Sequence, residues 1–232
     1  MTADRWVART VRERLGLGRL VPLGEAADGA WLAERAADPV LRRAAAAVPA
    51  VVPVSLRVGL ADPAETAEPA VPPPPGALPP GPLRIEADFA ATADAPLPVT
   101  AAALRAALFT AARESLGLLV TEVDLRVTDL LDQAPAAAAP PEEPAAVPPP
   151  VEPAAGAAPT GAVAAVAARV PGVAVLTGAL GAPVREEDGH IRIELATTRE
   201  HRALDVAKAV RSAVTAGRTD RPTVTVVITA VV

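Results

Sequence analysis

The pattern of apolar and polar positions divides the chain into short helices and strands. Apolar residues recur at three- and four-residue intervals over 38–48, which predicts a helix with one buried face that Pro49 ends. Apolar and polar residues alternate over 54–60 and again over 83–89, as they do in a half-buried strand. A helix that starts at a Thr100 cap and a strand over 121–128 complete this series.

The same order of elements recurs in the last quarter of the chain. A short helix leads into the turn Val170-Pro171-Gly172-Val173, and Asp188-Gly189 is a strong hairpin signal. A strand over 191–195 follows the hairpin, then an amphipathic helix over 201–215 and a β-branched strand over 223–232. Both series therefore read helix, strand, strand, helix, strand.

The segment before the first series is predicted from weaker signals. Residues 19–23 read as a short strand, and residues 30–37 read as a helix that Asp28 caps. A second helix is expected to restart at Asp38-Pro39, because proline is favoured in a first helical turn.

The sequence thus predicts an α/β fold of the α+β type, made of two small repeated units. The first unit spans 19–133 and the second 160–232, and both are expected to be separate domains. A proline-rich insertion at 62–82 is expected to leave the first sheet, because proline lacks the N–H that a strand ladder needs. Residues 134–159 are nearly all Pro, Ala and Glu, which predicts an extended, disordered linker. Residues 1–18 are predicted to form a basic amphipathic helix.

Composition excludes several classes of function. The chain has no cysteine, so disulfides and thiolate catalysis are excluded. A net charge of −5 argues against a general nucleic-acid binder. No apolar run approaches the ~20 residues that span a bilayer, so no transmembrane segment is expected. The first 16 residues carry charges throughout, unlike a secretory signal, and a cytoplasmic protein is expected.

Four segments carry a resemblance to a known family: Ala164–Val173, Gly189–Leu195, Asp205–Val214 and Val224–Val231. In this order they resemble the bacterial alkaline-shock (general-stress, envelope-associated) protein family, and the first unit looks like a diverged copy with Ala50 in place of the turn glycine. The resemblance implies a non-enzymatic, self-associating protein, sometimes held peripherally at the membrane by a separate anchor. It implies no catalytic residues and no cofactor.

Two groups of residues in the second unit are candidates for an interface. One is the polar stripe of the last helix, which is either a solvated face or a contact surface: His201, Asp205, Lys208 and Ser212. The other lies on the closing strand, which has Val224 on its apolar face and Val227 and Val231 on a second face that is therefore partly apolar. Such a strand is either buried on both faces or meets another subunit.

The N-terminal helix is a third candidate surface. Its residues Arg5, Trp6, Arg9 and Arg12 could place it on a partner or an anionic membrane. Alternatively, Trp6 and Val11 dock it onto the first unit while the arginines stay solvated. The docked arrangement is favoured because the segment is short and also carries acidic residues.

Chemistry-bearing clusters are sparse. His190 follows Glu186, Glu187 and Asp188, a set that could bind a divalent cation, but a solvated acidic turn is the favoured interpretation. Gly178–Gly181 reads as a bend and not as a phosphate cradle. No catalytic residue, metal or cofactor is predicted, and the protein is not expected to be an enzyme.

The leading hypothesis is an interaction or scaffold protein of the alkaline-shock type, which forms a homo-oligomer or binds a protein partner. A small-molecule-sensing module is the alternative. Nucleic-acid binding through the N-terminal arginines is a weaker alternative.

Overall fold

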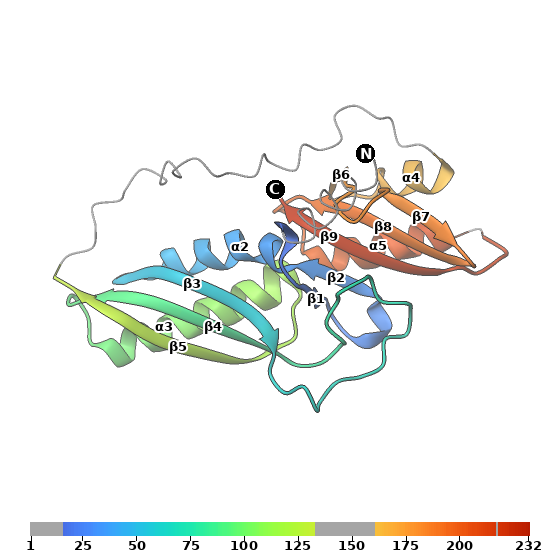
Figure 1. Cartoon of the computed structure of the whole chain (residues 1–232). Helices are drawn as coiled ribbons and strands as arrows, with labels where there is room; N and C mark the ends of the chain where they lie inside the picture. Colours follow the sequence, from blue (N-terminus) through green and yellow to red (C-terminus); the bar gives the residue numbers. More distant parts are fainter. Residues whose placement is uncertain (1–15, 133–160, 217) are drawn as a thin grey trace, which may run out of the picture.

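A computed structural model describes residues 16–132, 161–216 and 218–232 (Figure 1). The elements of the first part of the chain are β1 (Leu20–Pro22), the 3-10 turn η1 (Ala26–Asp28), β2 (Ala30–Ala33), α2 (Glu34–Ala46), β3 (Val51–Leu60), β4 (Leu83–Thr92), α3 (Leu97–Thr110), the π-helical turn η2 (Ala111–Leu116) and β5 (Val120–Leu131). The second part contributes α4 (Ala162–Ala167), β6 (Val173–Leu176), β7 (Val184–Glu187), β8 (His190–Thr197), α5 (Ala203–Thr215) and β9 (Thr223–Val231). Helices combined with mixed sheets confirm the predicted α/β class.

The strands form two sheets that lie side by side in an elongated molecule (Figure 1). One is three-stranded, in the order β3-β4-β5, with β3 antiparallel and β5 parallel to β4. The other has the order β1-β2-β9-β8-β6, and β7 also pairs with β8. Within it β6 is antiparallel and β9 parallel to β8, so the pairing of β6, β8 and β9 has the same order as that of β3, β4 and β5.

Strand β2 joins the two parts of the chain. It lies parallel to β9, with Trp31 opposite Val227, although the sequence interpretation assigned it to the first unit. All four residues of β2 are buried, and the buried apolar residues of both parts form one connected core. The two predicted units therefore share a sheet and a core.

The proline-rich segment at 62–82 connects the antiparallel strands β3 and β4, as expected, and folds back over the shared sheet. The indole N–H of Trp31 donates to the carbonyl oxygen of Leu78 at 3.1 Å, and the Thr225 hydroxyl donates to that of Pro72 at 2.9 Å. Leu78 N–H also donates to the Leu20 carbonyl oxygen, which covers the outer edge of β1. The excursion thereby ties β4 of the first sheet to β1, β2 and β9 of the other.

Three local predictions were wrong. Ala30–Ala33 form a strand and not the start of a helix, because a short, fully apolar run has no period that separates a buried strand from a buried helix. Helix α2 runs without interruption through Pro39. Helix α3 begins at Leu97, so Thr100 is a buried residue inside it and not its cap.

Turn chemistry was predicted correctly. Asp188 and Gly189 both have positive φ, 48° and 74°, and join β7 to β8 in a tight hairpin. Gly117 ends η2 in the left-handed conformation, with φ 90°.

Candidate functional site

The outer face of the three-stranded sheet carries a polar grid. The other face of this sheet is apolar, includes Leu83, Ile85 and Phe89 of β4, and packs on the helices. On the opposite face the register aligns nine positions in three rows: Gly59, Arg84 and Glu122; Arg57, Glu86 and Asp124; Ser55, Asp88 and Arg126. We call these nine positions the polar grid. The alternation of polar residues predicted its exposure, but not which residues of β3, β4 and β5 lie beside one another.

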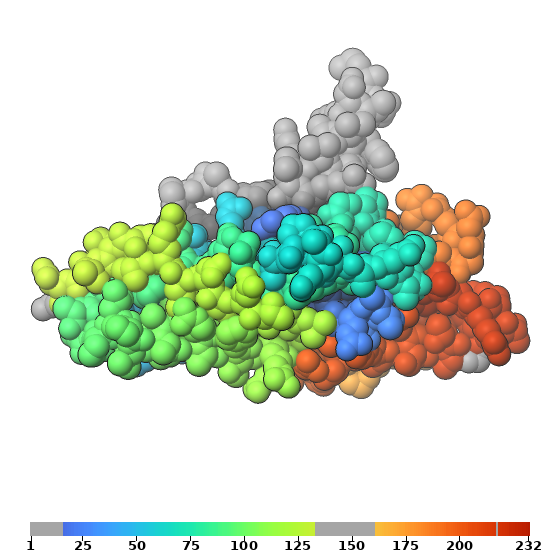
Figure 2. All heavy atoms as spheres, turned by 90° about the horizontal axis from the view of Figure 1, so that it is seen from below, coloured from blue at the N-terminus to red at the C-terminus, as the bar shows by residue number. Residues whose placement is uncertain are grey.

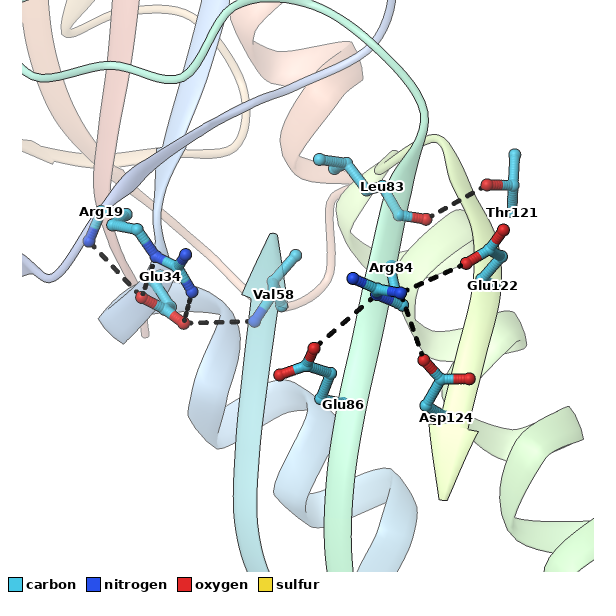
Figure 3. A network of polar contacts seen from close by, with 9 residues as sticks. All are labelled: Arg19, Glu34, Val58, Leu83, Arg84, Glu86, Thr121, Glu122 and Asp124. Atoms are coloured by element: carbon cyan, nitrogen blue, oxygen red, sulfur yellow. Dashed lines mark hydrogen bonds and ion pairs between the residues drawn. The ribbon is translucent and has the colours of Figure 1, made fainter. Parts of the chain in front are cut away.

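Arg84 is the centre of one ion-pair cluster in the grid (Figure 3). Its guanidinium lies 3.7 Å from the carboxylate of Glu86, 3.8 Å from that of Glu122 and 3.6 Å from that of Asp124. These are long, exposed pairs, which contribute little to stability. One guanidinium among three carboxylates leaves this cluster net negative.

Asp88 is the centre of the other cluster. Arg126 donates to both of its carboxylate oxygens, at 2.8 and 3.0 Å, and the Ser55 hydroxyl donates to it at 2.8 Å. The hydrogen bonds from Arg126 and then from Ser55 lower the pKa of Asp88 below its ordinary value. Asp88 is therefore a fixed, ionised acceptor at neutral pH and is poorly suited to accept a proton in catalysis.

Two hollows lie over this face. The larger, of about 370 Å³, is lined by residues of the second and third rows, and the smaller, of about 260 Å³, extends past Arg57 to Arg19 and the proline-rich segment. Arg19 is itself held by Glu34, the first residue of α2 (Figure 3). Burial raises the pKa of Glu34, but hydrogen bonds from Arg19 and from the Val58 N–H outweigh it and lower the pKa overall.

The two long edges of this sheet differ. Strand β3 has an outer edge blocked by its own chain: the Val58 N–H donates to Glu34, Arg42 donates to the Val54 carbonyl oxygen, and Pro53 has no N–H. A bulge between Pro53 and Ser55 distorts it further. These are the devices by which proteins protect an edge strand from pairing.

Strand β5 pairs with β4 alone among the described strands. Its register shifts at residues 121 and 128, but it runs regularly over 122–127, where its outer edge is more open than that of β3. Arg105 of α3 donates to the Val123 carbonyl oxygen at 3.3 Å, which places the Val123 backbone on that outer edge. Because strand backbone groups alternate in direction, Leu125 and Val127 direct theirs to the same edge. No strand in the described part of the chain pairs with this side of β5.

Helix α3 lies next to this edge and is apolar on almost every side. Arg105 is its single charged residue. Among its outward positions, Val99 is 61% exposed and Leu97 37% exposed, and Ala102, Ala103 and Ala106 are exposed as well. A helix that is apolar on all sides is normally buried. Figure 2 shows α3 and β5, in green and yellow-green, at the end of the molecule away from β8 and β9.

The valines of the closing strand do not form a free surface. Val224 and Val227 are fully buried and Val231 is 9% exposed, because β9 is a central strand between β2 and β8. Of the two arrangements predicted for this strand, the structure has the one buried on both faces. An interface on Val224, Val227 and Val231 is therefore corrected to a core position.

The polar stripe of α5 is exposed. Asp205, Lys208 and Ser212 lie on its outer side, and His201 is exposed just before the helix, which begins at Ala203. Lys208 makes an ion pair with Asp28 at 3.2 Å, which links α5 to η1. The stripe is the solvated face of an amphipathic helix, apart from this tie between the two parts of the chain. The candidate residues Arg5, Trp6, Arg9 and Arg12, and the proposed linker, lie outside the described residues.

The histidine cluster does not come together. His190 Nδ1 lies 2.8 Å from the Thr223 hydroxyl, while the Glu187 carboxylate pairs with Arg185 and that of Glu186 with Arg218. Within the ranges the structure describes, no group of three or more metal-ligating side chains is positioned to hold an ion. Burial, and then the charge of Arg192, lowers the pKa of His190.

The glycine bend at 178–181 is filled by a side chain of the protein itself. Glu194 is fully buried, accepts the Leu180 N–H at 2.8 Å and lies 3.1 Å from Arg192. Burial raises the pKa of Glu194. The backbone N–H of Leu180, which a phosphate would need, is thus occupied by the Glu194 carboxylate.

Comparisons with protein-family models, with curated proteins and with solved structures find no match to this chain. Among the described residues, no helix combines the length and apolar character that crossing a membrane requires.

Proposed function

We propose that this chain is a non-enzymatic interaction or scaffold protein, which self-associates or binds a protein partner through the β5 edge and the outer surface of α3. The observation that carries the proposal is the open β5 edge beside a helix with one charge. An exposed edge offers unpaired backbone groups to an added strand, and a neighbouring apolar surface contributes burial.

The order of elements supports the same proposal. The β3-β4-β5 and β6-β8-β9 pairings match in direction, as expected for two related units of the alkaline-shock type. The self-association and the peripheral attachment to the membrane that this resemblance implies belong to the proposal, as does a cytoplasmic location.

The first test replaces the most exposed apolar residue of α3. Val99→Glu places a charge on the proposed surface, while Val166→Glu makes the same change on α4, where Val166 is 38% exposed. Light scattering coupled to size exclusion over a concentration series, with circular dichroism to check folding, should show a complex of the full chain that Val99→Glu weakens and Val166→Glu leaves intact.

Two results contradict the proposal. One is a mass of 23.4 kDa at every concentration, with no protein partner recovered by affinity capture. The other is a complex that both substitutions weaken equally, because this would place the interface away from α3.

Binding of a small, polar ligand in the hollow of about 370 Å³ is the second candidate function. Two observations make it the weaker candidate. The lining is charged, whereas small ligands usually occupy mostly apolar pockets, and Asp88 and Arg126 already pair with each other. A thermal-shift screen of the full chain tests it, since a ligand at 100 times its Kd stabilises the folded state by about 2.7 kcal/mol.

A further inference from the structure

The exposed residues of β5 follow a self-complementary order. Along the grid face the strand reads Glu122, Asp124, Arg126, and along the other face Val123, Leu125, Val127, before the register shifts at Thr128. An antiparallel partner must pair residues whose backbone groups both point to the shared edge, so only some registers are compatible with hydrogen bonding. The charges can be compared in each of these registers.

Around the middle of the strand, a two-fold axis at Leu125 pairs opposite charges and opposes no like charges. It places Asp124 opposite Arg126 of the second copy, twice, and Glu122 opposite position 128, where the register of β5 shifts. An axis at Asp124 would pair Glu122 with Arg126 twice but would also place two aspartates opposite each other, and an axis at Arg126 would oppose two arginines. An axis at Val123 would pair Glu122 with Asp124. Opposite charges across strands stabilise a sheet and like charges destabilise it.

The backbone fits the same register. Val123, Leu125 and Val127 direct their N–H and C=O groups outward, so Leu125 would pair with itself and Val123 with Val127. Three such pairs, with two hydrogen bonds each, give about six new backbone hydrogen bonds. Arg105 would release the Val123 carbonyl oxygen to the incoming N–H.

The side chains leave room for the new ion pairs. Arg126 uses Nε and Nη2 for Asp88, so Nη1 is left to reach the second copy. Asp124 contacts Arg84 through Oδ2 at 3.6 Å, which leaves Oδ1. The α3 helices of both copies would lie on the same face of the joined sheet, one on each side of the axis.

We propose that the β5 edge binds the β5 edge of a second copy of this chain, antiparallel and with a two-fold axis at Leu125. The inference rests on the proposed interaction function and specifies the partner. The product is a continuous six-stranded sheet in the order β3-β4-β5-β5-β4-β3, with an interface in which each contact occurs twice.

The decisive experiment uses two matched substitutions in the full chain. Asp124→Arg and Glu122→Arg change the net charge equally, lie on the same strand face, and each removes one contact with Arg84, at 3.6 and 3.8 Å. In the proposed dimer, however, Asp124 faces Arg126, whereas Glu122 faces position 128, an uncharged threonine at a register shift of β5. We expect sedimentation equilibrium to show the dimer Kd rising about 10- to 100-fold for Asp124→Arg and less than about 3-fold for Glu122→Arg.

Cross-linking tests the register directly, because the chain has no cysteine. Opposite residues outside the hydrogen-bonded pairs have Cα atoms about 4.5 Å apart, within the range of a disulfide. A mixture of Asp124→Cys and Arg126→Cys chains should therefore oxidise to a covalent heterodimer. A mixture of Glu122→Cys and Arg126→Cys, which is two residues out of register, should not.

The outcomes separate the inference from the function on which it rests. A dimer that Val99→Glu weakens but Asp124→Arg does not would overturn the β5 register and keep an interface on α3. A monomer that captures a foreign protein, with binding lost in Val99→Glu, would overturn the second copy as occupant and keep the interaction function. A monomer without any partner would overturn both.

Discussion

Gly117→Ala measures how firmly the two parts of the chain are packed together. Gly117 ends η2 in the first part with φ 90°, and its carbonyl oxygen accepts the Gly24 N–H at 3.2 Å. A methyl group added there would lie 2.4 Å from Cβ and 3.0 Å from Cδ2 of Leu204, on α5 of the second part. Since Cβ cannot rotate away, either α5 or the turn must shift.

The expected loss has two components. A left-handed alanine costs about 1–2 kcal/mol relative to glycine, and overpacking of a filled contact costs about 1–3 kcal/mol more. Gly117→Ala should therefore lower the free energy of unfolding by about 2–5 kcal/mol. Gly189→Ala is the matched control, because Gly189 has φ 74° and nothing lies within 4 Å of an added methyl group.

Urea unfolding followed by circular dichroism gives both values, with the slope m compared to check that the same surface is exposed. The control should lose about 1–2 kcal/mol, so the difference between the variants isolates the contact with Leu204. Equal losses in the two variants would refute the packing of η2 against α5. Two separate unfolding transitions in the unsubstituted chain would refute the shared core.

Two further predictions concern buried polar groups, and they join those for Val99 and Asp124 above. Trp31→Phe should cost about 1–3 kcal/mol in urea unfolding, because the Leu78 carbonyl oxygen loses its buried donor, and limited proteolysis should then cut residues 62–82 faster. Burial raises the folded-state pKa of Glu194 above its unfolded-state pKa, so the folded protein binds this proton more tightly. The stability that Glu194 contributes is therefore fully present below the unfolded-state pKa and is lost as the pH rises through the folded-state pKa. The stability of the unsubstituted chain relative to Glu194→Gln should therefore fall with rising pH; a difference that rises with pH would show that the ion pair with Arg192 dominates.

The elements that the sequence predicted well are those whose signals are local. The alternation of apolar and polar residues located β4 because one face of its sheet is exposed to solvent. Asp188-Gly189 located the β7–β8 hairpin because few residue pairs adopt two consecutive positive φ angles. The helix over 201–215 was found by its buried stripe, within two residues of α5.

The elements that it missed depend on distant partners. Strand β2 pairs with β9, which lies at the other end of the chain. All four residues of β2 are buried, so its sequence does not show the alternation of apolar and polar residues by which strands are predicted. The same pairing explains the valines of β9. The sequence showed that both faces of β9 carry apolar residues. It did not show whether β2 or another subunit covers them.

The candidate site was missed for a related reason. Alternation over 121–128 located β5. Whether an edge of a strand is open depends on which other strands lie beside it, and the sequence of the strand itself does not contain this information. The apolar character of α3 was a usable signal. With one charge among its 14 residues, this helix should have been expected to be covered on more than one side.

The distribution of edges supports placing the proposed self-association at the first sheet. In the second sheet, β9 is paired on both sides, with β2 and β8. The proline-rich segment covers the outer edge of β1, and β6 and β7 have only four residues each. In the first sheet β3 is blocked by α2, which leaves β5, with 12 residues, as the longest edge without a strand beside it in the described chain. By pairing β2 with β9, the chain itself supplies the second neighbour of the closing strand. The corresponding strand of the first part, β5, has no such partner among the described strands, so in the proposed dimer a second copy supplies the neighbour that β2 supplies to β9.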